Sequence, residues 1–314
     1  MKQCSINKIN KQSGIALVIV LWMLSLLIIL AMGYSRMVRI ETSLTSNLVH
    51  YSQAKSIAEA GIWQSIAELL KPTVEQQWET NGTPYSFEFE EGTVNVSVIN
   101  ETGKIDLNTA HSELLHGLIK SIELPEENQL ALTQAILDWR DKDNLVRNHG
   151  AEDEDYQQLD YLYGAKDGPF NSLNELQLVM GMTTETYNKL KPALTIYSRQ
   201  AGINPNSAPK ASLLAIPSIS EEQVDAFLQS RSENQGAQTP SLFIGTNPKY
   251  LSKSNGQVFS ITSEGIIGKT HARLEVIVLM KRQNNKPYVI LAWQEASGSS
   301  KATINLETEN NTKS

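Results

Sequence analysis

The densest group of side chains able to do chemistry is the acidic stretch DWRDKDNLVRNHGAEDEDYQQLD, residues 138–160, whose eight acids and three basic residues leave a charge of −5. Carboxylates this close repel one another unless they are solvated or share a cation. Ca²⁺ suits such a loop because it takes roughly six to eight oxygen ligands in flexible geometry. Gly150 does not occupy the sixth position of an EF-hand loop opening at Asp138, Asp141 or Asp143. From charge alone, a calcium site and a solvated acidic loop both stay open.

Other chemistry finds little support in the residues. Paired carboxylates that hydrolyse a substrate need an enclosing cleft and separated pKa values, whereas this stretch is hydrophilic throughout. The five histidines form no HExxH spacing, and the single cysteine, Cys4, excludes an internal disulfide or a thiolate cluster. No phosphate-binding glycine loop or nucleophile elbow is present in the sequence. We therefore do not expect this protein to be an enzyme.

Length and net charge further limit the number of domains and the class of protein. The chain has 314 residues, enough for about two ordinary domains. Its net charge of −7 argues against a protein that coats nucleic acid or an anionic membrane surface.

An apolar segment near the amino terminus predicts a membrane-spanning helix. From Ile15 to Met32 only Ser25 is polar, and these 18 residues would rise about 27 Å as a helix, close to the thickness of a bilayer core. Three lysines and no acid precede Ile15, which favours a cytoplasmic amino terminus. Helical spacing of apolar residues then continues until Pro72, so one helix should run from about 15 to 70.

The remaining chain predicts a sheet interrupted by helices. Residues 83–100 alternate apolar and polar side chains about a Glu-Gly turn, which is typical of a hairpin, and a second strand-rich block spans 256–295. In that second block we expect turns at Glu264-Gly265 and Asn284-Asn285. Residues 105–250 have helix patterns, and the polar segment 296–314 is expected to be disordered. Buried positions are predicted for Trp63, Trp139 and Trp293.

The helical region contains a repeat: IDLNTA, from Ile105, recurs as INPNSA, from Ile203, and a Leu-Leu pair follows each. Asn, Thr and Ser are good helix-starting residues, and Ser172 with Glu175 has capping-box spacing. The arrangement resembles tandem helix-hairpin-helix or SAM-like modules, which often bind DNA. However, no basic cluster accompanies the hairpins at 181–183 and 217–219, so a helical scaffold is favoured over a DNA-binding module.

The amino terminus, KQSG followed by the apolar run, resembles the class III signal of type IV pilins and type II secretion pseudopilins. Joined to an INxNSA-type helical insertion, it is similar to the minor pseudopilin K family of type II secretion systems. The resemblance implies that prepilin peptidase cuts between Gly14 and Ile15 and that the new terminus is methylated. Most pilins have Glu at the fifth mature position, whereas this chain has Ile19. Because a buried carboxylate needs a partner, Ile19 suits a subunit with none above it, at the tip.

The resemblance also implies that the acidic stretch binds structural calcium. Carried over by position, the ligands that match best are Asp138, Asp141, Asp143 and Glu152, with Asp153, Asp155 and Asp167 as further candidates. The implied partners are other minor pseudopilins in a hetero-oligomeric tip complex, prepilin peptidase and the inner membrane, with no nucleic acid.

These patterns predict an α+β, pilin-like fold in which a long helix packs on an antiparallel sheet and a large helical domain is inserted between strands. The expected organisation is a leader at 1–14, a transmembrane and stalk helix at 15–72, sheet residues at 83–104 and 251–295, an insert at 105–250 and a tail at 296–314. The expected protein spans the inner membrane once, carries its carboxyl-terminal domain in the periplasm and takes part in protein export. The alternatives are a membrane-anchored helix-hairpin-helix DNA receptor of the competence type and a signal-anchored periplasmic binding protein, and both require an uncut amino terminus.

Overall fold

The computed structural model describes residues 13–72, 77–233, 247–281 and 286–296. Most of the expected leader with Cys4, the turn at Asn284-Asn285 and nearly all of the expected tail lie outside these ranges. The chain forms two compact units, Met1–Gln53 and Ala54–Ser314, and the division between them falls within the first helix.

The first unit is the amino-terminal part of helix α1 (Ser13–Leu69), which is the long helix predicted from the sequence. Its large apolar side chains are exposed in the isolated chain, with Trp22 the most exposed of those between Ile15 and Met32 at 77%. The hydroxyl of Ser25 donates to the carbonyl of Leu21 at 2.8 Å, so even the single polar side chain of this segment is satisfied within the helix. By length and composition this helix can cross a membrane.

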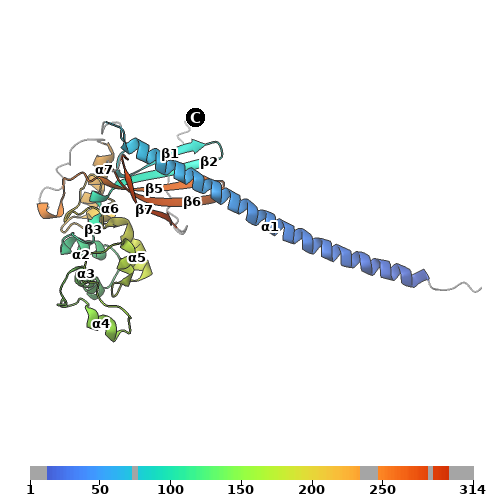
Figure 1. Ribbon diagram of the computed structural model, residues 1–314, viewed down its shortest axis with the longest axis horizontal. Helices are drawn as coiled ribbons and strands as arrows, with labels where there is room; N and C mark the ends of the chain where they lie inside the picture. The colour runs from blue at the N-terminus through green and yellow to red at the C-terminus, as the bar shows by residue number, and fades with distance from the viewer. Residues whose placement is uncertain (1–12, 73–76, 234–246, 282–285, 297–314) are drawn as a thin grey trace, which may run out of the picture. The chain divides into compact units, whose positions relative to one another are not determined.

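The second unit contains a five-stranded antiparallel sheet in the order β1-β2-β5-β6-β7 (Figure 1). The first hairpin forms as predicted, and β5 and β6 come from the second strand-rich block, so the chain returns to the sheet after a long excursion. The strands are β1 (Asn81–Phe89), β2 (Gly92–Asn100), β5 (Val258–Ile267), β6 (Thr270–Leu279) and β7 (Val289–Ala296).

The carboxyl-terminal part of α1 packs on one face of this sheet (Figure 1). Ala58, Ile62 and Ile66 are buried at helical spacing and form one core with inward-facing valines of β2 and β6. The helix comes so close to β5 that a Cβ atom on Gly265 would lie 1.9 Å from the carbonyl oxygen of Ala54.

The predicted turn at Glu264-Gly265 is wrong. Both residues lie within β5 and pair with Arg273 and Ala272, and the chain turns instead at Gly268, whose φ is +58°. A glycine next to a polar residue reads as a turn, but Gly265 serves to admit the helix rather than to bend the strand.

The residues between β2 and β5 form a second core made almost entirely of helices. Its short parallel pair, β3 (Ile105–Asp106) with β4 (Leu194–Thr195), places the beginning and middle of the insert side by side. The helices are α2 (Ser112–Lys120), α3 (Glu126–Arg140), α4 (Asp153–Gln158), α5 (Thr184–Leu190), α6 (Lys210–Leu214) and α7 (Glu221–Glu233), with the 3₁₀ turns Glu101–Gly103, Leu173–Leu178, Lys191–Ala193 and Pro248–Tyr250.

The two sequence repeats have the same local structure. Asp106 accepts the N–H of Asn108 at 2.9 Å, and Asn204 accepts the N–H of Asn206 at 3.1 Å. Ile105 pairs in parallel with Leu194, and Ile203 forms a parallel bridge with Leu251. The polar residue at the second repeat position therefore makes a turn ahead of a helix instead of capping the helix itself.

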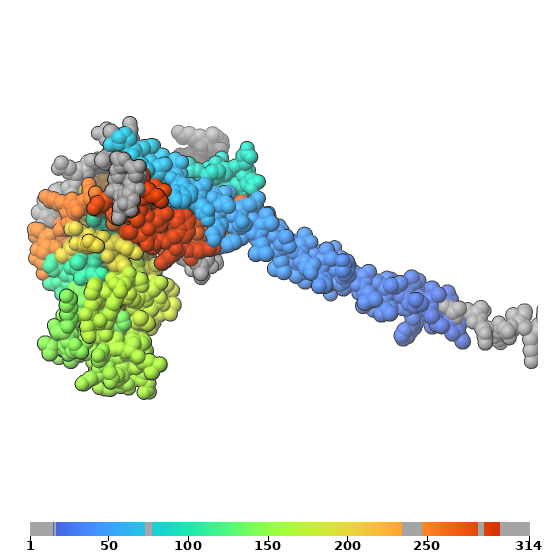
Figure 2. All heavy atoms as spheres, in the orientation of Figure 1, coloured from blue at the N-terminus to red at the C-terminus, as the bar shows by residue number. Residues whose placement is uncertain are grey.

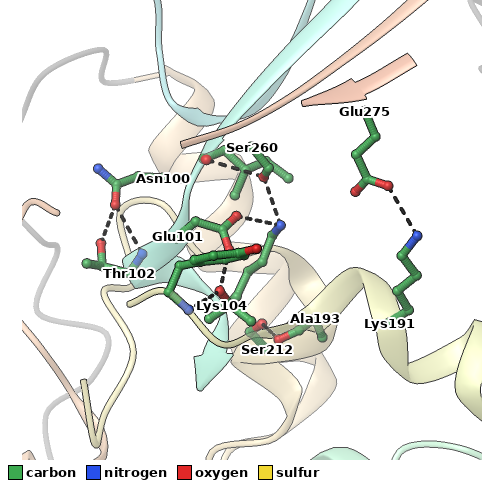
Figure 3. Close-up of polar contacts among 12 residues, drawn as sticks. Asn100, Glu101, Thr102, Lys104, Lys191, Ala193, Ser212, Ser260 and Glu275 are labelled. Atoms are coloured by element: carbon green, nitrogen blue, oxygen red, sulfur yellow. Dashed lines mark hydrogen bonds and ion pairs between the residues drawn. The ribbon is translucent and has the colours of Figure 1, made fainter. Parts of the chain in front are cut away.

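A buried ionic cluster joins the insert to the sheet. The Lys104 ammonium group donates to Glu101 Oε1 at 2.7 Å and to Ser260 on β5 at 2.8 Å, and Lys104 and Glu101 are both buried (Figure 3). The hydroxyl of Thr195 on β4 donates to the other oxygen of Glu101. A second, more exposed pair joins Lys191 to Glu275 on β6 at 3.2 Å (Figure 3).

Two smaller expectations are corrected. Trp139 is buried, but Trp63 and Trp293 are partly exposed and lie against each other at a ring separation of 6.0 Å, on α1 and the edge strand β7. Ser172 precedes a 3₁₀ turn without a side-chain capping bond, and the Glu175 carboxylate accepts the N–H of Asn171 at 3.2 Å and contacts Lys166 at 2.6 Å. The acid of the predicted capping box therefore bonds the backbone one residue before Ser172 and also forms an ion pair.

Candidate functional site

The acidic stretch occupies the end of α3, the loop after it and α4, at the end of the insert farthest from the sheet (Figure 1). Loop residues 141–152 and 159–172 flank α4 in sequence. Figure 2 shows this part of the insert, in green, projecting as an outer surface.

Asp138 is the organising residue of the first loop. Its side chain is fully buried, and Oδ2 accepts the N–H groups of Ala151 at 2.9 Å and of Arg147 at 3.3 Å. A Cβ atom on Gly150 would lie 1.8 Å from Oδ2, so only glycine lets the chain pass this carboxylate. Asp138 thus folds residues 147–151 back onto α3.

Two arginines within the acidic stretch hold it in place, and sequence reasoning gave neither of them a role. The guanidinium group of Arg147 contacts both Asp138 and Asp141, the latter at 2.5 Å. Arg140 donates to the carbonyls of Leu107 at 2.6 Å and Ala110 at 2.9 Å, and burial lowers its pKa. The position of both arginines among acids indicates that they neutralise nearby carboxylates. The contacts of Arg140 with carbonyls some 30 residues earlier in the chain could not be predicted from the sequence.

Glu152 is the acid of the group whose buried charge is least compensated. Its residue is 5% exposed, and although its side chain is placed at the N–H of Asp155 as in a capping box, neither carboxylate oxygen makes a hydrogen bond to any residue that the structure describes. Burial, reinforced by the charges of Asp138, Asp167 and Asp141, raises the pKa of Glu152 to about 7. A buried carboxylate without a donor is costly, so this site favours a proton or a cation.

Asp167 belongs to the same group although it comes later in the sequence. Its Oδ1 is buried without a partner, and its backbone has a φ of 52°, which is uncommon for a residue other than glycine. Burial and the charges of Asp153, Asp141 and Asp143 raise the pKa of Asp167. The two loops therefore bring their carboxylates within electrostatic reach of one another.

The other predicted ligands have more ordinary surroundings. Asp143 is exposed and accepts the N–H of Leu145 at 3.1 Å. Asp155 accepts the N–H of Glu152 at 2.9 Å, which starts α4. Asp153 lies against Gly164, where an added Cβ would stand 1.8 Å from its Oδ1.

The donors are of the chemical type that a hard cation takes, but they are not arranged around one point. Among the described residues, buried carboxylate oxygens on Asp141, Glu152 and Asp167 have no hydrogen-bond partner, and oxygen is the ligand that Ca²⁺ takes. Within the described ranges, no three His, Cys, Asp or Glu side chains stand in metal-binding geometry. The acids are gathered but not centred on one point, because Arg147 holds Asp138 and Asp141 on its own side. An ion would have to draw the remaining oxygens together.

The helix hairpins have the wrong charge for nucleic acid. Helix α5, after the hairpin at 181–183, has Glu185 in its first turn, and α7, after the hairpin at 217–219, begins with Glu221 and Glu222. A phosphate would meet carboxylates at the helix ends that otherwise attract it. The geometry does not favour the DNA-receptor alternative.

The residues predicted for processing, Gly14 and Ile15, lie in the first turn of α1. Ile19 lies one turn further along and is 54% exposed. The predicted membrane segment, Ile15 to Met32, is therefore one uninterrupted piece of helix with an apolar side chain at the fifth position after Gly14.

Comparison with known proteins agrees with this architecture. The family model described as "Type II secretion system (T2SS), protein K" matches residues 92–199, which contain the acidic stretch. The type II secretion system protein K of Aeromonas hydrophila is 27% identical over 317 residues, covering 88% of this chain and 95% of the relative. The protein K of Pseudomonas aeruginosa is 23% identical, and the alignment covers 82% of this chain and 85% of the relative. The protein K of Dickeya chrysanthemi is 30% identical, and that alignment covers 46% of this chain and 42% of the relative.

A solved structure has the same fold. A chain in the crystal structure of the GspK-GspI-GspJ complex from the type 2 secretion system of enterotoxigenic Escherichia coli aligns with a TM-score of 0.53 at 18% identity, covering 83% of this chain and 99% of that chain. The α+β fold expected from the sequence is confirmed. With its long apolar helix, its sheet and its helical insert, this chain is similar to type II secretion system protein K in sequence over most of its length and in fold.

Proposed function

We propose that this protein is a minor pseudopilin that caps the tip of the type II secretion pseudopilus and takes part in export without chemistry of its own. The observation that carries the proposal is Ile19 on the uninterrupted helix α1. A subunit inside the filament can pair a carboxylate at this position with the ammonium terminus of its neighbour. A subunit with nothing above it would bury that charge unpaired, and an apolar side chain avoids the cost.

The surface of the helix indicates two successive environments. Cleavage between Gly14 and Ile15 would release a basic leader and leave an apolar segment, Ile15 to Met32, in the inner membrane with the second unit in the periplasm. The exposed apolar side chains of this segment need lipid or other apolar helices around them. Assembly would exchange the first environment for the second. The partners would be other minor pseudopilins, and the solved structure that shares this fold is itself a GspK-GspI-GspJ complex.

Mass spectrometry of the mature amino terminus tests the processing step. In cells with prepilin peptidase we expect a chain that begins at a methylated Ile15, and in cells without it a chain that retains Met1. An intact Met1 in both strains would contradict the assignment of Gly14 and would favour a signal-anchored protein.

We propose further that the acidic end of the insert binds Ca²⁺ as a structural ion. Asp141, Glu152 and Asp167 would supply the oxygens that lack partners, with Asp143 and Asp153 close by. Asp138 and Asp155 hold the backbone of the loops, and an oxygen of Asp138 would have to be shared with the ion because both of its oxygens already accept hydrogen bonds. The ion would supply positive charge where Arg147 neutralises only part of the cluster.

Thermal unfolding of the full-length protein with calcium or with a chelator tests this proposal. Because an ion that binds only the folded state stabilises it, we expect the melting temperature to be higher with calcium. A melting temperature that does not move between the two conditions would contradict a structural calcium ion.

A further inference from the structure

The loop after α4 exposes apolar side chains, which is unusual so close to an acidic cluster. We call Leu159, Tyr161, Leu162 and Tyr163 the α4 loop surface. Leu162 is fully exposed, at 103% of its reference area, and Leu159 is 60% exposed. Single exposed leucines are common, but several large apolar side chains on one short loop are typical of an interaction site.

The base of this surface is fixed by aromatic contacts. Tyr161 and Tyr163 lie 5.9 Å and 5.7 Å from the ring of Tyr156, which is fully buried. Tyr163 also meets Trp139 edge-on at 6.4 Å. Because the rings on both sides of Leu162 are anchored against Tyr156 while keeping an exposed edge, the fully exposed side chain of Leu162 lies between two fixed neighbours.

The backbone of the loop is equally well defined. The N–H of Tyr161 donates to the carbonyl of Tyr156 at 3.1 Å, and Asp160 adopts a φ of 60° to make the bend. At the other end, a Cβ on Gly164 would collide with Asp153, so the chain returns tightly against α4. A surface held in one conformation loses little entropy when a partner covers it.

Charge around the α4 loop surface selects the partner. Residues 138–167 contain nine acids and four basic residues, a balance of −5. Three of the basic residues are engaged elsewhere: Arg140 with backbone carbonyls, Arg147 with Asp138 and Lys166 with Glu175. Exposed acids, Glu154 and Asp160, lie within or next to the loop, while Leu145 and Val146 add exposed apolar side chains on the preceding loop. A second copy of this end, or an anionic lipid surface, would be repelled.

We propose that the α4 loop surface docks a protein partner that receives Leu162 in an apolar pocket with a basic rim. Leu159 and the tyrosine edges would close the contact around Leu162, and Glu154 and Asp160 would pair with the basic rim. The apolar side chains supply affinity, and the acids favour a cationic partner over acidic ones. The surface does not involve α1, so the proposal stands whether or not the chain occupies the tip.

Site-directed photo-crosslinking in cells tests the proposal on the full chain in its secretion system. A benzophenone side chain in place of Leu162 should yield a discrete protein adduct, and mass spectrometry should place the link in a segment where apolar residues are flanked by Lys or Arg. The matched control is the same probe at Glu127, an exposed position on α3. We expect Leu159→Ser to lower the adduct yield about tenfold, as loss of an interface anchor does.

The charge term is tested with Glu154→Gln and Asp160→Asn together, since asparagine tolerates the positive φ at 160. We expect about a threefold lower yield from the double variant, with an unchanged melting temperature because both side chains are exposed. An adduct yield no higher than at Glu127, an adduct with lipid, a linked segment without basic residues or a double variant with the original yield would each overturn the proposal.

Discussion

The carbonyl oxygen of Ala54 on α1 lies 1.9 Å from the point where Gly265 on β5 would carry a Cβ atom. Helix and sheet meet here backbone to backbone, and the absence of a side chain at 265 makes the contact possible. The packing of the carboxyl-terminal part of α1 on the sheet therefore depends on Gly265, some 200 positions later in the sequence.

We expect Gly265→Ala to destabilise the second unit by about 1–3 kcal/mol, the range for overpacking a tight interior. Gly168→Ala is the matched control, because its Cβ atom would meet the Lys166 carbonyl oxygen at an ordinary 3.8 Å. Urea unfolding of both variants measures the difference. Equal stability of the two would mean that α1 does not approach β5 as closely as described.

The buried pair Lys104 and Glu101 should matter more than any exposed ion pair. Lys104→Met leaves the Glu101 carboxylate buried without its cation, and we expect a loss of roughly 3–5 kcal/mol in the free energy of unfolding. Lys104→Met combined with Glu101→Leu should recover part of that loss, because both charges are then gone. Lys210→Met, which breaks an exposed pair with Asp225, should leave stability nearly unchanged. A Lys104→Met protein as stable as the Lys210→Met protein would contradict this description of the joint.

Glu152 separates calcium binding from mere charge reduction. With a chelator at pH 8, we expect Glu152→Gln to raise the melting temperature, since it removes a buried charge that repels Asp138 and Asp167. In the same variant, calcium should raise the melting temperature much less than in the unchanged protein, because a neutral amide replaces a carboxylate ligand. Glu154→Gln removes an exposed acid from the same stretch and should keep the calcium response. An equal calcium response in both variants would exclude Glu152 as a ligand.

Ile19 offers a test in the membrane segment. We expect Ile19→Glu to lower export of a reporter protein severalfold, because the new carboxylate would lie in the apolar filament core without a partner. Ile19→Leu keeps the apolar surface and should export normally. Normal export by Ile19→Glu would show that a partner for the charge exists above this subunit.

Strand and helix periodicity predicted the long helix, the first hairpin and the strand-rich second block, because each of these buries one regular face. The turn at Glu264-Gly265 was wrong because a glycine that admits a helix and a glycine that bends a strand look alike in sequence. From charge alone the acidic stretch could be singled out, but a calcium site and a solvated loop both stayed open. The separate roles of its acids could not be predicted, because they depend on how the loops fold over α3. Asp138 accepts the N–H of Ala151, and Asp155 accepts the N–H that starts α4. Glu152 is left without a hydrogen-bond partner among the described residues.

The position of this subunit in the filament is the central claim, and labelling it in assembled pseudopili tests that claim most directly. An epitope in the helical insert, detected with gold-labelled antibody on isolated filaments, should appear once per filament and at one end only. Label distributed along the filament shaft would contradict the proposed place at the tip.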